Sequence, residues 1–180
     1  SGNAFMAGNA ALDAARNQGA NATRTLLEQL HIRPAVLGFP VEFRKDDATF
    51  ERDLEKLDES AQFAKSIGCP RMVTFIPSSS ETPKRELRAL YKRRFSASAA
   101  ILAKHDVRLG LEFLGPLHIR KRFPYEFIWQ MPEMLEFAQE CGFNCGLLLD
   151  SWHWHHAGAT TDDIVAAGKR GIVHVHFNDA

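Results

Sequence analysis

Apolar and polar positions follow two patterns along this chain, one typical of helices and one of buried strands. Apolar residues recur every three or four positions, the spacing of one helix face, in segments that we predict as helices: 23–30, 47–67, 87–104, 131–141 and 161–167. Short, nearly continuous apolar runs separate them and are predicted as strands: 32–39, 71–76, 107–113, 146–149 and 172–177. Strands that alternate with helices form βαβ units, so the pattern predicts an α/β fold with a parallel sheet.

The first 22 residues do not share this pattern. Fifteen of them are Ala, Asn or Gly, which leaves few large apolar side chains to anchor the segment. We therefore predict a poorly anchored N-terminal segment at 1–22, in which 10–17 could form a short helix that ends at Gly19. No internal repeat or low-complexity linker divides the remainder, so 23–180 is predicted to be one domain.

Composition and charge argue against several classes of protein. Hydrophobic residues make up 45% of the 180 residues, and 22 Lys and Arg balance 22 Asp and Glu, as in ordinary globular proteins. Without a basic excess, a general nucleic-acid binder is disfavoured, and no apolar run approaches the ~20 residues of a membrane span. Three cysteines without C-x-x-C spacing, together with no signal-peptide pattern, favour a cytoplasmic location.

Three of the predicted strands end in an ionisable side chain. Glu112, Asp150 and His176 each come last or nearly last in their strand. Functional groups of parallel α/β proteins gather at the carboxyl ends of strands, so these three are expected on one rim, where they could coordinate a divalent cation. Either carboxylate could instead cap the following helix or pair with an arginine. His174 shares a strand face with His176, one layer deeper, and is expected to be a core group or one that orients a ligand.

A histidine-rich segment follows the fourth predicted strand. His153 is expected on the loop after this strand, where it could bind substrate or a second metal ion. Trp152 and Trp154 flank it and could form a wall for the C–H face of a sugar, although ordinary hydrophobic packing explains them equally well. His155 and His156 are interpreted as loop-surface or helix-capping groups.

Other chemistries have little support. The sequence contains no G-x-S-x-G, no G-x-x-x-x-G-K-[ST] and no G-x-G-x-x-G motif, so a nucleophile elbow, a P-loop and a dinucleotide fingerprint are all missing. The basic run at 118–122 (HIRKR) could recognise phosphate, but a solvated loop is the simpler interpretation.

Three segments resemble the sugar phosphate isomerase/epimerase family, the xylose isomerase-like TIM barrels that include inosose isomerases and dehydratases. They are 109–116 (LGLEFLGP), 146–154 (GLLLDSWHW) and 173–180 (VHVHFNDA). A D-x-x-H motif followed by H-x-H-x-x-D, both after a glutamate at a strand end, is a fairly specific combination. Loops at 38–44 (GFPVEFR) and 74–77 (TFIP) are similar to the family as well, and the resemblance covers about 23–180.

The resemblance implies a (β/α)8 TIM barrel with one divalent metal ion at its C-terminal mouth, held by Glu, Asp, His and a final Glu. Glu112, Asp150 and His176 match the first three ligands, and His153 matches the substrate-contacting histidine of D-x-x-H. The ion (Mn, Co, Zn or Mg) would polarise substrate oxygens as a Lewis acid. Glu112 and the final Glu would exchange a proton next to a carbonyl, through an enediolate. The implied activity is that of an isomerase or epimerase of a sugar, sugar phosphate or inosose-type keto-polyol.

The chain departs from the family pattern at both ends. The final Glu belongs to the last barrel strand, which has no counterpart before Ala180, and the first two strands have none before Thr23. The predicted strands therefore look like strands 3–7 of an incomplete barrel, and we expect either a fragment or a truncated form. Two alternatives stay open: a metal-dependent dehydratase of the inosose or dehydroshikimate type, and a truncated non-catalytic binding protein. The expected partner is a small-molecule sugar or polyol, not nucleic acid or a membrane, and a homo-oligomer is left open.

Overall fold

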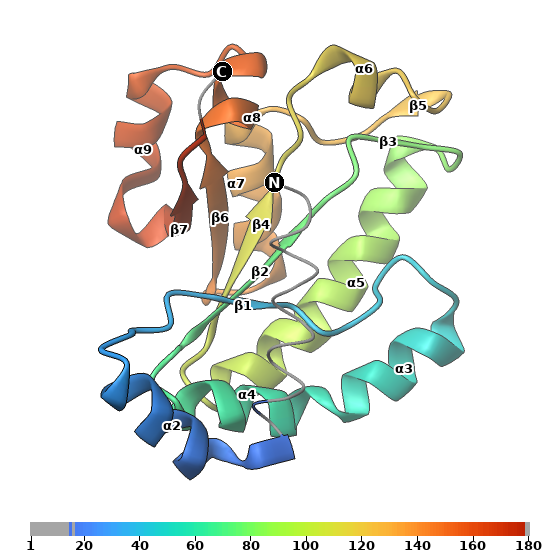
Figure 1. The fold of residues 1–180 in the computed structure, drawn as a ribbon. Coiled ribbons are helices and arrows are strands. Elements are labelled where there is room, and N and C mark those ends of the chain that lie inside the picture. The colour runs from blue at the N-terminus through green and yellow to red at the C-terminus, as the bar shows by residue number, and fades with distance from the viewer. Residues whose placement is uncertain (1–14, 16, 179–180) are drawn as a thin grey trace.

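Five parallel strands form one sheet in the computed structural model, which describes residue 15 and residues 17–178 (Figure 1). The strands are β1 (Leu37–Gly38), β2 (Arg71–Phe75), β4 (Arg108–Glu112), β6 (Cys145–Asp150) and β7 (Ile172–His176). They lie side by side in this same order, and each neighbouring pair is parallel. The predicted helix at 10–17 lies largely outside the described residues, as does Asp179 of the H-x-H-x-x-D segment.

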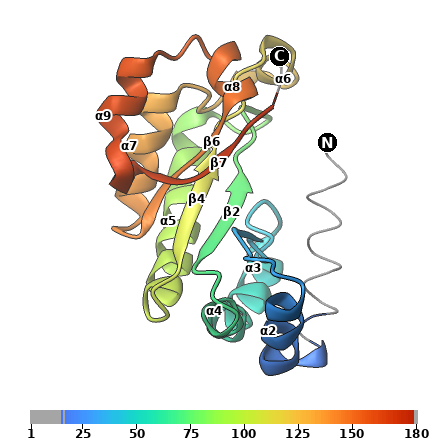
Figure 2. The same ribbon diagram turned by 60° about the vertical axis from the view of Figure 1, so that its left-hand side comes forward.

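Helices connect successive strands, so the arrangement is a half-barrel with the connectivity of a (β/α)8 barrel. The helices are α2 (Ala20–Gln29), α3 (Asp47–Glu55), α4 (Leu57–Ser66), α5 (Lys84–Ala103), α6 (Leu117–Arg120), α7 (Met131–Cys141), α8 (Ser151–His156) and α9 (Thr161–Gly171). A separate antiparallel pair, β3 (Ser79–Ser80) with β5 (Tyr125–Glu126), lies beside α6 beyond the carboxyl ends of the strands (Figure 1). The second view shows α5, α7 and α9 along one face of the sheet (Figure 2).

Two predicted elements differ from the structure. The strand predicted at 32–39 is reduced to β1, because Pro34 and Pro40 lack the N–H that a sheet ladder needs. The helix predicted at 47–67 is divided at Lys56 into α3 and α4. Ser60 Oγ donates to the Lys56 carbonyl at 2.9 Å, a back-bond that bends helices. The helix predicted at 131–141 is present with the same bounds as α7, and the other predicted helices and strands are present with shifted ends.

Strand alternation gives the sheet two different faces. Leu109, Leu111 and Leu147 are fully buried in the core against the helices. Gly110 points the other way, into the barrel interior, where a Cβ would lie 3.0 Å from Val73 Cγ1 and 3.3 Å from Val173 Cβ. A larger residue there would push the strands apart. Because glycine has no side chain, Val73 and Val173 can pack close together in the barrel interior below Glu112.

A buried arginine fixes the loop between β1 and α3. Arg94 of α5 is 3% exposed and donates to the carbonyls of Phe43 at 2.7 Å and Lys45 at 2.6 Å. Its other terminal nitrogen pairs with Asp47 at 2.6 Å, and this pairing lowers the pKa of that carboxyl. Buried charges persist where hydrogen bonds satisfy them, so Arg94 ties this loop to the helix layer.

None of the helices in the described part of the chain combines the length and apolar character needed to cross a membrane. The three cysteines, Cys69, Cys141 and Cys145, are buried and free. Burial raises the pKa of Cys141 and of Cys145 to about 12, so these two thiols stay protonated near neutral pH and act as core residues.

Candidate metal and active site

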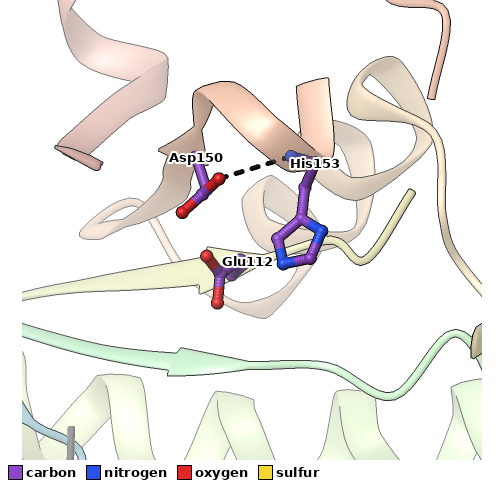
Figure 3. Close-up of side chains that lie close together, drawn as sticks. All are labelled: Glu112, Asp150 and His153. Atoms are coloured by element: carbon purple, nitrogen blue, oxygen red, sulfur yellow. Dashed lines mark hydrogen bonds between the residues drawn. The ribbon is translucent and has the colours of Figure 1, made fainter. Parts of the chain in front are cut away.

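Glu112, Asp150 and His153 come together at the carboxyl ends of β4 and β6. One ligand atom from each lies within 4.8 Å of the other two (Figure 3). Glu112 ends β4 and Asp150 ends β6, and Asp150 is only 5% exposed. His153 was expected on a loop, but it lies in the short helix α8, which follows β6 directly. The three side chains thus come from two neighbouring strand ends and one helix.

Asp150 has a structural role as well as a place in this cluster. It is the N-cap of α8, and its Oδ1 accepts hydrogen bonds from the backbone N–H of Trp152 at 2.8 Å and of His153 at 3.3 Å. A carboxylate is favoured at a helix N-terminus because it satisfies donors that have no partner within the helix. The capping role considered from the sequence is therefore present, and it also brings His153 toward Glu112.

The position of α8 depends on Gly115, in the segment after β4. A Cβ on this buried glycine would lie 2.3 Å from the carbonyl oxygen of His153 and 2.6 Å from the backbone N of Ala157. Contacts this close exist only because glycine has no side chain. The backbone after Glu112 and the backbone of α8 therefore touch, which sets the distance between Glu112 and His153.

His176 and His174 lie on the neighbouring strand β7. His176 is paired with Asp150 in the strand register, and its Nδ1 lies 3.9 Å from Asp150 Oδ2. The side chain of His176 is 34% exposed, and it is not one of the three residues of the compact cluster. His174 lies behind it with the two rings perpendicular at 5.1 Å, and the pKa of His174 is lowered mainly by burial.

Asn178 is a contact residue that the sequence interpretation did not single out. Its Nδ2 donates to Asp150 Oδ2 at 2.5 Å, and its backbone N–H donates to Ser151 Oγ at 2.9 Å. Ser151 Oγ is likewise 2.9 Å from the Asn178 carbonyl oxygen. Both oxygens of Asp150 are thus oriented by hydrogen bonds. The available signal was its position within the H-x-H-x-x-D segment, two residues after His176.

Burial makes the site electrostatically unusual. The pKa of Glu112 is raised to about 8, chiefly by burial and further by the charge of Asp150. Among the described residues, no hydrogen bond or ion pair reaches the Glu112 carboxyl. Burial also lowers the pKa of His153, against the opposing effect of Asp150. Near neutral pH the site therefore holds a neutral imidazole and a carboxyl group poised to gain or lose a proton.

These donors fit a divalent cation. Carboxylate oxygens and a neutral imidazole are ligands of Mn, Zn and Mg sites, and a cation would relieve the repulsion between Glu112 and Asp150. His153 Nδ1 is buried and has no hydrogen-bond partner among the described residues. Buried polar atoms usually have such a partner, so this nitrogen lacks one that a ligand could supply.

The two tryptophans have different surroundings. Trp152 is half-buried and makes a T-shaped contact with His156, with ring centroids 4.2 Å apart. Trp154 packs against the hydrophobic core, and its Nε1 donates to the Thr160 carbonyl at 3.3 Å. These contacts match the hydrophobic-packing interpretation for Trp154. His155 and His156 end α8, and both are exposed.

Two of the cations in the basic run at 118–122 have structural partners. The first residues of this run form α6, and the Arg120 guanidinium lies 3.4 Å from the centroid of the Trp129 ring. Glu126 pairs with Arg120 at 3.3 Å and with Lys121 at 2.9 Å. These partners give the two cations a structural role beside the mouth of the half-barrel.

Known proteins share this fold. The chain is 25% identical over 153 residues to inosose isomerase of Halalkalibacterium halodurans, a match that covers 83% of this chain and 51% of that protein. A xylose isomerase domain protein from Alicyclobacillus acidocaldarius superimposes with a TM-score of 0.86 at 27% identity, covering 93% of this chain and 60% of that one. The IOLI protein with a bound zinc atom has a TM-score of 0.67 at 21% identity, with 87% and 56% covered.

The chain therefore spans about half to three fifths of the length of these proteins. The family model described as xylose isomerase-like TIM barrel matches residues 4–180, which is nearly all of the sequence. With the parallel half-barrel and the cluster at its strand ends, this match shows that the chain belongs to the xylose isomerase-like TIM barrel family.

Proposed function

We propose that the protein is a divalent-metal-dependent isomerase or epimerase of a sugar, sugar phosphate or inosose-type keto-polyol. The observation that carries this proposal is the convergence of Glu112, Asp150 and His153, with the pKa of Glu112 at about 8. The relative named inosose isomerase supports the reaction type, and the zinc-bound IOLI protein supports a metal on this fold.

We assign Glu112, Asp150 and His176 to the metal ion and His153 to the substrate, as the resemblance to the family implies; His176 lies next to the cluster, with its Nδ1 3.9 Å from Asp150 Oδ2. The ion, when bound, would act as a Lewis acid on the oxygens of the substrate. Asp150 is kept in place for this task by its hydrogen bonds to α8 and to Asn178. His174 packs against His176 and would orient it.

Glu112 would move the proton. Its carboxylate would remove a proton from the carbon next to the substrate carbonyl, hold it on a carboxyl oxygen and return it to the enediolate. The pKa of about 8 is that of the metal-free site, and a bound cation would lower it, so that Glu112 is ionised and can act as the base. His153, neutral near pH 7, could then hydrogen-bond a substrate hydroxyl without adding charge.

The decisive experiment is to combine metal binding with proton exchange on the full chain. We expect about one Mn²⁺ per chain by equilibrium dialysis, and deuterium incorporation next to the carbonyl of an inosose in D2O, followed by NMR. Absence of specific metal binding would remove the proposal. Loss of a substrate hydroxyl in place of exchange would assign the chain to the dehydratases.

His153→Ala is expected to separate the two proposed roles of the cluster. Because His153 is assigned to the substrate, its loss should raise the substrate Kd about tenfold or more and change the Mn²⁺ Kd by less than about threefold. Titration calorimetry with Mn²⁺ and then with an inosose measures both, and His155→Ala on the same helix is the control. A larger increase in the Mn²⁺ Kd than in the substrate Kd would make His153 a metal ligand.

Metal affinity is expected to rise with pH. Glu112 must be ionised to bind a cation, and its pKa of about 8 leaves it mostly protonated at about pH 6.5. The Mn²⁺ Kd should therefore fall roughly 15-fold between about pH 6.5 and about pH 8. The Mn²⁺ Kd is measured at each pH from the electron paramagnetic resonance signal of free Mn²⁺. Glu112→Gln should bind weakly with a shallower pH dependence, and equal slopes in both proteins would assign the proton to another group.

We also propose a cytoplasmic location. The three cysteines are buried without a disulfide, which is usual for proteins of a reducing compartment.

A further inference from the structure

Arg44 extends from the loop between β1 and α3 over the end of β2. Its guanidinium carbon lies 4.8 Å from the centroid of the Phe75 ring and 5.3 Å from that of Phe43. Arg44 is exposed, whereas Phe43 beneath it is only 1% exposed. Stacking on aromatic rings holds a guanidinium in place and leaves its N–H edge free to bind a ligand.

Phe75 places this guanidinium beside the proposed active site. Phe75 and Glu112 are direct Cα partners across β2 and β4, where strands are about 4.8 Å apart. Val73 contacts the interior position of Gly110, and side chains two residues apart share a face, so Phe75 and Glu112 both point into the barrel. Arg44 therefore stacks on the side chain of the residue that is paired with Glu112 across β2 and β4.

Arg44 differs from two other arginines near this end of the sheet, Arg94 and Arg120, whose guanidinium groups are paired. Arg94 is satisfied by two carbonyls and Asp47, and Arg120 pairs with Glu126. No hydrogen bond or ion pair joins Arg44 to any residue within the described part of the chain. Because Arg94 holds the neighbouring carbonyls of Phe43 and Lys45, the backbone that carries Arg44 is fixed.

We propose that Arg44 binds an anionic group, a carboxylate or a phosphate, on the substrate of the proposed reaction. The inference rests on the proposed function and sharpens it: the substrate is an acidic or phosphorylated keto compound, with its anion toward β2 and its reacting carbon at Glu112. A planar guanidinium forms paired hydrogen bonds with either anion, so Arg44 would select anionic over neutral substrates.

Matched ligands test the proposal on the full chain loaded with Mn²⁺. Dihydroxyacetone is the neutral probe, hydroxypyruvate replaces one of its arms with a carboxylate, and dihydroxyacetone phosphate adds a phosphate. Titration calorimetry should show at least one anionic probe binding the wild type about tenfold or more tightly than the neutral probe. The anionic probe with the larger gain in affinity over dihydroxyacetone shows whether Arg44 binds a carboxylate or a phosphate. Arg44→Gln should abolish that preference and leave the neutral probe within about twofold, and Lys45→Gln, which removes a charge from the same loop, should retain it.

The possible failures are distinguishable. If the wild type binds no Mn²⁺, the proposed function fails with the site itself. If Mn²⁺ binds but Arg44→Gln leaves the anion preference intact, the metal attracts the anion and the role of Arg44 is refuted. Equal weakening of all three probes would refute it too, because a purely structural stack would act on every ligand. Arg44→Lys keeps the charge and should retain part of the preference, which gives an independent reading if the glutamine variant folds poorly.

Discussion

Glu112→Gln is expected to abolish proton exchange while leaving the chain folded. Glutamine has nearly the same shape but cannot accept the proton, and loss of a general base typically costs about 10²–10⁴ in rate. NMR of an inosose in D2O, with Mn²⁺ at saturating concentration, measures the loss. Unchanged turnover would remove Glu112 from its proposed acid–base role.

Stability of the same variant provides a second measurement. A carboxyl pKa raised to about 8 means that the metal-free folded chain keeps a proton that the unfolded chain releases near pH 4.3. The free energy of unfolding should therefore decrease as the pH rises from about 4.3 to about 8. Glu112→Gln should remove this decrease, so the variant should be the more stable of the two at about pH 8. Glu126→Gln is the control: Glu126 is half-buried but its pKa is lowered by Lys121 and Arg120, so this variant should keep the decrease.

Local pattern was sufficient to predict the five strands of the parallel sheet, although not the length of β1, and the residues that end β4 and β6. Strand β6 is a continuous apolar run followed by Asp150, and β4 ends in Glu112 in the same way. Since parallel strands place their carboxyl ends together, the sequence alone predicted that these two carboxylates share a rim. The structure confirms the parallel sheet and brings both side chains into one cluster.

The contacts that shape the site could not be predicted in this way, because they join distant parts of the chain. Asn178 reaches Asp150 across 28 positions, and Arg44 meets Phe75 from another loop. The sequence showed His153 near Asp150 but not the helical turn that aims it at Glu112. That turn depends on a carboxylate cap and on the absence of a side chain at Gly115. Neither feature changes the spacing of apolar residues along the sequence, from which the helices were predicted.

Gly115→Ala is expected to damage both the fold and the site. Its Cβ would lie 2.3 Å from the His153 carbonyl oxygen and 2.6 Å from the Ala157 nitrogen, and neither backbone atom can move without moving α8. Overpacking of this kind typically costs about 1–3 kcal/mol and occasionally more, and we expect about 3 kcal/mol in the free energy of unfolding. Urea denaturation followed by circular dichroism measures it.

The same substitution should weaken Mn²⁺ binding, because a displaced α8 moves both the cap at Asp150 and the ring of His153 away from Glu112. We expect the Mn²⁺ Kd to rise about tenfold. Gly158→Ala, just beyond the end of α8, is the matched control. No atom lies within 4 Å of its added methyl group and its φ is +65°, so it should cost only about 1 kcal/mol in backbone strain and leave the Mn²⁺ Kd unchanged. If both variants lost stability equally and both still bound Mn²⁺, the close contact at Gly115 would not be what positions the cluster.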